Sequence, residues 1–148
     1  MPIFATAVRW FLTAGLCLAA LTGTRPLLAA DPPSGPGVGP VKKVEVGPLD
    51  AAKAKEGAAV FETKCSACHK LDERYVGPAL KGVTQRRQPE WIMNMILNPE
   101  EMAHEDPTAQ KLLGEHMVQM TFQNVSQDDA RKILEYFRQV DGAGAAAK

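Results

Sequence analysis

The chain has 148 residues, with 17 basic and 17 acidic side chains, 45% hydrophobic residues and three cysteines. A chain of this length forms one ordinary domain. The balanced charge gives no electrostatic basis for binding nucleic acid or for a polybasic membrane anchor, and an odd number of cysteines argues against a framework in which all of them pair as disulfides.

The N-terminus has the pattern of a secretory signal peptide. Arg9 precedes an apolar run at positions 10–21, which is shorter than the roughly 20 residues that span a bilayer as a helix. A positive charge, a short apolar segment and the small residues Ala29 and Ala30 together indicate export and cleavage. We therefore predict a signal peptide over residues 1–30 and a periplasmic location, with an uncleaved membrane anchor as the alternative.

Cys17 lies inside this apolar run, so cleavage would remove it. A lipoprotein site would need a small residue directly before the cysteine, and Leu16 occupies that position. The exported chain would therefore keep two cysteines in an oxidising compartment, and no transmembrane span.

Composition divides the rest of the chain into three parts. Residues 31–50 interleave prolines with glycines, and such a segment has little to bury and few regular hydrogen bonds, so we predict a flexible leader. Residues 141–148 are predicted to be a flexible tail. The remaining residues, 51–140, form one small domain. A hydrophobic core of this size gives only marginal stability without an added cross-link, metal or cofactor.

The sequence CSACH supplies such a stabilising attachment. Cys65, Cys68 and His69 form the C-x-x-C-H pattern of covalent c-type haem attachment. On a helix the three side chains would project from one face, so that both sulfurs reach the haem vinyl groups while the imidazole lies under the iron. A zinc site would want a second pair of ligands, and a thioredoxin-like redox disulfide would want a βαβ context; the sequence offers neither.

Two later segments carry helix signals. Asp106 and Pro107 suit a helix start and Gly114 a helix stop. Ser126 suits the N-cap of a final helix that runs to about residue 140, with acidic residues in its first turn. The apolar stripe of that helix consists of Ala130, Ile133, Leu134, Phe137 and Val140.

The segment GAAVFETKCSACH resembles the N-terminal helix and haem motif of the monohaem class I c-type cytochromes. The resemblance covers nearly all of the predicted domain. It implies an all-α cytochrome c fold, in which three to five short helices wrap around one covalently bound haem c. It also implies that the terminal helices pack crosswise, with Gly57 and Phe61 of the first meeting Ile133 and Tyr136 of the last.

The segment GPALKGVTQRR is similar to the loop that follows the haem motif in this family. The resemblance implies that the carbonyl of Pro78 accepts a hydrogen bond from Nδ1 of His69. Such a bond leaves Nε2 of His69 as the iron ligand. Leu80 is the next residue of this loop that we expect to contact the haem.

The family also places polar side chains near the haem propionates, because burying these groups without donors is costly. By resemblance, Arg86 is the expected partner of one propionate, with Arg87 as the alternative. The indole N–H of Trp91, in a short helix before an Asn-Pro step, is the expected donor to the other.

The sixth iron ligand is expected to be Met120. It lies six residues before Ser126, the spacing at which the family brings its ligand loop back before the last helix, although the Pro that often follows that methionine is missing. Met117 is the second candidate. His104 and His116 keep a bis-imidazole site open as an alternative.

The resemblance implies an electron carrier with His/Met ligation and no enzymatic activity of its own. Its partners would be redox proteins, as respiratory donor and acceptor, including a terminal or denitrification reductase, and the protein itself would be a monomer. A haem-based gas sensor or a peroxidase-like protein with an open sixth position is the alternative. The segment 100–118 is longer than a compact family member needs and is expected to add a short helix over one haem edge.

Charges are also expected to separate on the surface. Basic residues gather around the haem-binding segments and acidic ones in the insertion, which predicts a dipolar surface that steers partners at low salt. The basic group is Lys64, Lys70, Lys81, Arg86 and Arg87, and the acidic group is Glu100, Glu101, Glu105 and Asp106.

Overall fold

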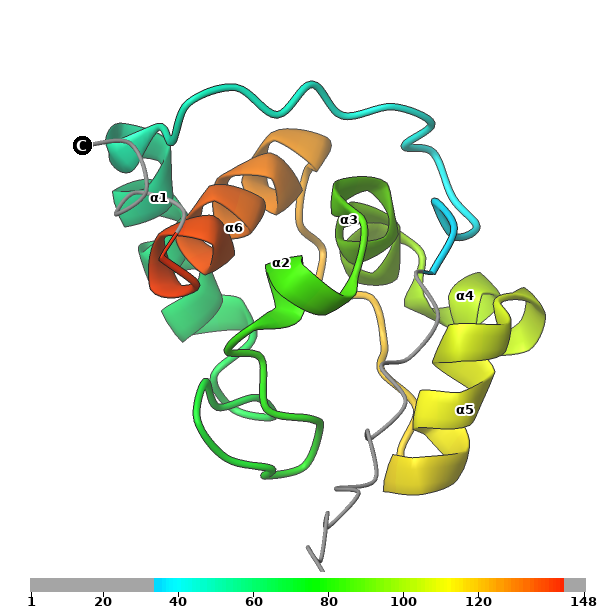
Figure 1. The fold of residues 1–148 in the computed structure, drawn as a ribbon. Coiled ribbons are helices and arrows are strands. Elements are labelled where there is room, and N and C mark those ends of the chain that lie inside the picture. The colour runs from blue at the N-terminus through cyan, green and yellow to red at the C-terminus, as the bar shows by residue number, and fades with distance from the viewer. Residues whose placement is uncertain (1–33, 143–148) are drawn as a thin grey trace, which may run out of the picture.

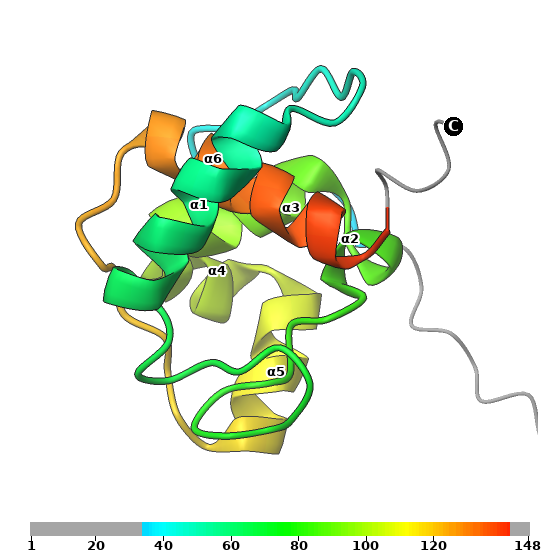
Figure 2. The same cartoon turned by 90° about the vertical axis from the view of Figure 1, so that its left-hand side faces the viewer.

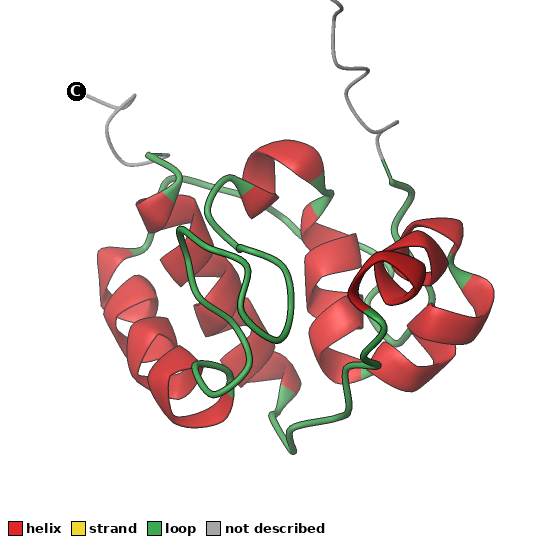
Figure 3. Cartoon of the chain, turned by 90° about the horizontal axis from the view of Figure 1, so that it is seen from below, coloured by secondary structure: helices red, strands yellow, loops and turns green. Residues whose placement is uncertain are grey.

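The computed structural model describes residues 34–142 (Figure 1). This part of the chain is helical and contains no strand (Figure 3), so the all-α prediction is confirmed. It has six helices rather than three to five, because a single turn forms α2 and the predicted insertion divides into two helices. The helices are α1 (Ala51–Lys64), α2 (Val83–Arg86), α3 (Pro89–Leu97), α4 (Pro99–Glu105), α5 (Pro107–His116) and α6 (Gln127–Val140).

The first and last helices cross at close range, as Figure 2 shows. Gly57 makes the crossing possible: a Cβ at this position would lie 2.0 Å from the carbonyl oxygen of Lys132 and 2.8 Å from the backbone nitrogen of Ile133. Next to it, the rings of Phe61 and Tyr136 have centroids 5.5 Å apart. The predicted contact between the terminal helices is therefore present, and its close approach requires a residue without a side chain.

Side-chain caps fix where these two helices begin. The Asp50 carboxylate accepts from the Lys53 backbone N–H at 3.0 Å at the start of α1. At the start of α6, the Ser126 hydroxyl accepts from the Asp129 N–H while the Asp129 carboxylate accepts from the Ser126 N–H. This reciprocal capping satisfies donors that the first helical turn leaves unpaired.

Residues 34–50 are anchored on the helices, which differs from the predicted flexible leader; we call this segment the strap. Figure 1 shows it running along one edge of the molecule to α1. Val41 is 2% exposed, and the buried Asn94 of α3 pairs with its backbone N–H and C=O and with the carbonyl of Pro36, each at 2.9 Å. A segment with few apolar side chains is thus held through its backbone, and its partner lies more than fifty residues later in the chain.

The predicted insertion forms α4 and α5, which meet at Asp106. The Asp106 carboxylate caps α5 by accepting from the Ala109 N–H at 2.9 Å, and Pro107 occupies the first turn. Gly114 does not end the helix as predicted; α5 continues to His116, and Met117 closes it with a left-handed backbone at φ 58°.

The end of α6 is also fixed, so the predicted tail does not begin at residue 141. The Asp141 carboxylate accepts hydrogen bonds from the Thr84 N–H at 2.9 Å, from the Thr84 hydroxyl at 2.6 Å and from the N–H of Gly82. Residues 143–148 of that tail lie outside the described residues, as do residues 1–33, which include the predicted signal peptide at residues 1–30. Within the described range, no helix is long and apolar enough to cross a membrane.

Candidate functional site

A cavity lies between the CSACH turn, α3, α5 and the loop that precedes α6; we call it the central cavity. Mostly apolar side chains line it, and they come from nearly every element of the fold. Its lining includes Phe61, Cys65, Cys68, His69, Val76, Gly77, Pro78, Leu80, Arg86, Arg87, Trp91, Ile92, Met95, Ile96, Leu112, His116, Val118, Gln119, Met120, Thr121, Gln123, Ile133 and Phe137.

The CSACH motif forms a turn directly after α1 rather than part of that helix. The N–H groups of Cys68 and His69 donate to the Cys65 carbonyl at 3.1 and 2.9 Å, so one helical turn continues locally past Lys64. Both cysteines are free thiols that line the central cavity. The motif therefore presents its two sulfurs and its imidazole to one space, as its spacing predicts.

The Cys65 thiol does not have the environment of a zinc ligand or a reactive nucleophile. Burial, reinforced by the neighbouring Cys68, raises the pKa of Cys65 to about 11, whereas metal binding and nucleophilic attack need the thiolate. Among the described residues, no group of three or more His, Cys, Asp or Glu side chains could hold a metal ion. Thioether formation with a cofactor remains the chemistry that suits this pair.

The His69 ring is held in one orientation. Its Nδ1 lies 3.2 Å from the carbonyl oxygen of Pro78, and a carbonyl can only accept, so Nδ1 carries the hydrogen and the lone pair resides on Nε2. Gly77 packs against the ring: a Cβ there would lie 2.4 Å from Cε1 of His69.

Burial lowers the pKa of His69, the hydrogen bond to Pro78 raises it, and the nearby His116 lowers it. Because burial is the largest of these effects, the neutral imidazole is favoured, and a neutral imidazole is the form that binds a metal. Gly77 was not among the predicted site residues, and its place directly before Pro78 is the only signal that the sequence carries for it.

The two arginines that were candidates for a propionate differ in their burial. Arg87 is buried, with its guanidinium carbon 5.4 Å from the centre of the Trp91 ring. Arg86 is exposed and donates to the carbonyls of Lys81 and Ala79 at 2.8 and 3.3 Å. Both line the central cavity, but Arg87 is the one whose side chain packs inside the protein.

Trp91 forms a wall of the central cavity, but its indole N–H is already in use. Nε1 donates to Oδ1 of Asp106 at 3.0 Å, in a buried contact between α3 and the start of α5. The expected role as a propionate donor does not fit this arrangement. Asp106 is also only 8% exposed, so it does not belong to the predicted acidic surface group.

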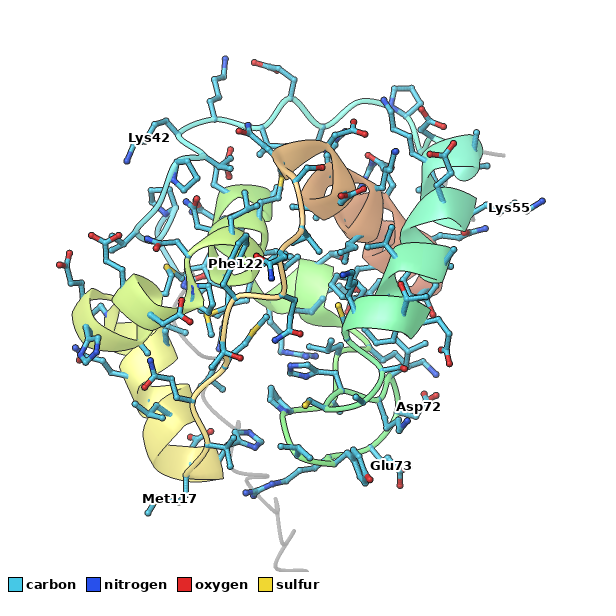
Figure 4. All side chains as sticks on the ribbon, turned by 180° about the vertical axis from the view of Figure 1, so that it is seen from behind. Lys42, Lys55, Asp72, Glu73, Met117 and Phe122 are labelled. Carbon is cyan, nitrogen blue, oxygen red and sulfur yellow. The ribbon has the colours of Figure 1, made fainter. Side chains whose placement is uncertain are left out.

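The methionines and histidines separate into those that face the central cavity and those that do not. Met120 is half-buried and lines the central cavity. Met117 is 83% exposed, and Figure 4 shows its side chain extending away from the molecule. His116 lines the cavity, whereas His104 is exposed on α4 and does not.

Taken together, these groups fit a covalently attached haem. Two free thiols, an oriented neutral imidazole and a thioether sulfur converge on one mostly apolar cavity. Gly77 leaves the imidazole the space that a side chain would fill. Leu80, Leu112, Met95 and Ile96 supply apolar walls.

Comparison with known proteins agrees with this geometry. The sequence model of a family described as cytochrome c matches residues 54–141. Among curated proteins, the cytochrome c-553-like protein of Synechocystis is 35% identical over 63 residues, which are 34% of this chain and 60% of that protein. Cytochrome c-551 of Stutzerimonas stutzeri is 46% identical over 39 residues, 26% of this chain and 38% of that protein. The matches thus span less than two thirds of these relatives.

Solved structures extend the similarity. Cytochrome c of Rhodothermus marinus is 50% identical, with a TM-score of 0.68 over 70% of this chain and 90% of that chain. The cytochrome c domain of a Pseudomonas putida protein is 26% identical, with a TM-score of 0.54 over 58% of this chain and 88% of that domain.

Proposed function

This chain belongs to the cytochrome c family and holds one covalent haem c, and we propose that it is an electron carrier with His69 and Met120 as axial ligands. In this proposal Cys65 and Cys68 form the two thioether bonds. One observation carries it: His69 and Met120 line one cavity from different elements, and the two free thiols lie beside them. When bound, the haem supplies an iron that gains and loses a single electron.

The residues of this chain hold and tune that group rather than act on a substrate. Pro78 holds His69 so that Nε2 faces the cavity. The apolar lining, with Trp91, Ile92 and Ile96 each less than a tenth exposed, keeps water away. A sulfur ligand favours the reduced state relative to a second imidazole, so Met120 would set a higher reduction potential than a bis-histidine site. No bond to a substrate is needed, and we propose no enzymatic activity.

Redox proteins are the proposed partners, with the exported, monomeric chain shuttling between a respiratory donor and acceptor in the periplasm. Lys64 is exposed and lines the central cavity, and the exposed Lys70 and Lys81 follow the lining residues His69 and Leu80 in the chain. Val76 and Val118, 37% and 52% exposed, also belong to the lining. An apolar centre with basic neighbours suits a partner with an acidic rim. Residues 1–30 are the proposed export signal.

The substitution Met120→Ala tests the axial ligand. The oxidised wild-type holoprotein should show the weak long-wavelength absorption band of sulfur-ligated ferric haem, and Met120→Ala should lose it because the iron loses its sulfur. Met117→Ala is the matched control, since its side chain is exposed, and it should keep the band. A high-spin wild-type spectrum would instead indicate an open sixth position and a gas-binding or peroxidase-like protein.

A further inference from the structure

The loop that carries Met120 connects α5 to α6 over residues 117–126 and has no regular secondary structure. Two of its residues adopt a left-handed backbone, Met117 at φ 58° and Asn124 at φ 53°, which is uncommon for residues other than glycine. Thr121 follows Met120, and unlike a proline it does not fix its own φ angle. The conformation of the loop therefore depends on what other parts of the molecule hold it.

One hydrogen bond ties the middle of this loop to another helix. The Phe122 N–H donates to Oε1 of Glu100 at 3.0 Å. In the part of the chain that the structure describes, no other backbone group of residues 118–125 hydrogen-bonds to a helix. The side-chain amide of Gln123 donates to the carbonyl and hydroxyl of Thr121, which lies within the loop itself. The bond to Glu100 is thus the backbone link between the loop and the packed helices.

Glu100 lies on a helix that the core holds firmly. It belongs to the first turn of α4, and Met102 and Ala103 of the same helix are 0% and 6% exposed. The Met102 sulfur also accepts the Val38 N–H of the strap at 3.0 Å. The Glu100 side chain itself is exposed, so its truncation would open no cavity in the core.

The position of the Phe122 amide limits where Met120 can lie. Two residues of extended chain span at most about 7 Å, so a fixed Phe122 N–H confines the Met120 backbone to a short distance from α4. Met120 lines the central cavity from this position. A loop released at Phe122 would be free to carry the Met120 sulfur away from the cavity.

We propose that Glu100 is a positioning residue, whose hydrogen bond with the Phe122 N–H keeps the Met120 sulfur at the sixth iron position and so protects that position from small exogenous ligands. The proposal rests on the proposed ligation by Met120. The apparent affinity for an exogenous ligand is its intrinsic affinity multiplied by the fraction of molecules in which the sulfur is displaced. Loss of the Glu100 carboxylate should raise that fraction.

The test measures imidazole binding to the oxidised holoprotein in wild type, Glu100→Ala, Glu100→Gln and Glu101→Ala. Imidazole replaces the sulfur, so its binding is followed by the loss of the long-wavelength absorption band. We expect Glu100→Ala to lower the dissociation constant about three- to tenfold, the effect of one hydrogen bond. Glu100→Gln keeps an oxygen that can accept the Phe122 N–H and should retain most of the wild-type value. Glu101→Ala is the matched control, because it removes the same charge from the same turn, where Glu101 accepts from Asn98.

Hydrogen exchange at the Phe122 amide gives a second readout, and it should become faster in Glu100→Ala alone. Unchanged imidazole binding in Glu100→Ala would overturn the proposal. An equal effect in Glu100→Ala and Glu101→Ala would also overturn it, because surface charge rather than the hydrogen bond would then control the loop. Failure of the Met120 assignment is distinguishable, since wild type would then lack the sulfur band before any substitution, which would overturn both proposals.

Discussion

Gly77 is the residue on which the orientation of His69 depends most directly. Gly77 packs against the imidazole, and the carbonyl of Pro78 next to it accepts the hydrogen bond from Nδ1. One two-residue segment therefore sets both the position and the tautomer of the His69 ring, the proposed iron ligand. Such support of a metal ligand normally affects metal affinity and potential as strongly as many direct contacts do.

The substitution Gly77→Ala should disturb this site. The new Cβ would lie 2.4 Å from Cε1 and 2.8 Å from Nδ1 of His69. The ring cannot move away without lengthening the hydrogen bond from Nδ1 to the Pro78 carbonyl. We expect a loss of about 1–3 kcal/mol in the free energy of unfolding, measured by denaturant unfolding of the holoprotein followed at the haem absorbance. Gly35→Ala is the control, because nothing lies within 4 Å of its Cβ position; equal losses in both variants would contradict the argument.

At the scale of elements, the crossing of α1 and α6 supports the side of the molecule that carries the CSACH turn. Glu135 of α6 is 0% exposed, and Arg131 and Arg138 each approach its carboxylate to 2.7 Å. Arg138 also donates to the carbonyl of Gly47 at 2.8 Å, which ties the strap to the same helix. A buried carboxylate paired in this way is tolerated only while all its partners stay in place.

The substitution Gly57→Ala should separate the two helices. The new Cβ would lie 2.0 Å from a backbone carbonyl, Lys132 O, which cannot rotate away. We expect destabilisation by at least about 2 kcal/mol, measured by thermal or denaturant unfolding. Gly114→Ala provides a control of opposite sign: it also lies within a helix, but its Cβ would meet no atom within 4 Å, so it should stabilise the protein by about 0.5–1 kcal/mol. Loss of stability in both variants would show that the crossing is not the cause.

At the scale of the whole molecule, α3 lies between the central cavity and the strap. Trp91, Ile92 and Ile96 line the cavity, while Asn94 on another face of the same helix binds the strap. The strap also reaches α4, where the Val38 N–H lies 3.0 Å from the sulfur of Met102. The strap thus binds a helix that also forms a wall of the central cavity.

The substitution Asn94→Leu should release the strap. It keeps a similar volume but removes the partners of Val41 N–H, Val41 C=O and Pro36 C=O. We expect about 1–3 kcal/mol of lost stability and fast hydrogen exchange at the Val41 amide, measured by NMR or mass spectrometry. Lys42→Ala, at an exposed position of the strap, should leave both unchanged. Slow exchange at Val41 in Asn94→Leu would contradict the anchoring role of Asn94.

The fold class followed from the family resemblance. The attachment motif and the start of the last helix could be predicted from the residues alone. Both depend on local spacing: CSACH fixes the positions of two sulfurs and an imidazole within five residues, and Ser126 with Asp129 fixes the start of α6 within one turn. The Pro78 partner of His69 and the crossing at Gly57 followed from the resemblance, and the structure contains both contacts.

Only the tertiary structure decided the contacts between distant segments. Composition could not show that the strap is anchored, because its partner Asn94 lies on α3. Composition also could not show that the Trp91 indole N–H donates to Asp106, or that Arg87 rather than Arg86 is buried. A polar side chain satisfies its hydrogen bonds with whichever group the fold brings near it, and that group is set by packing rather than by position in the sequence.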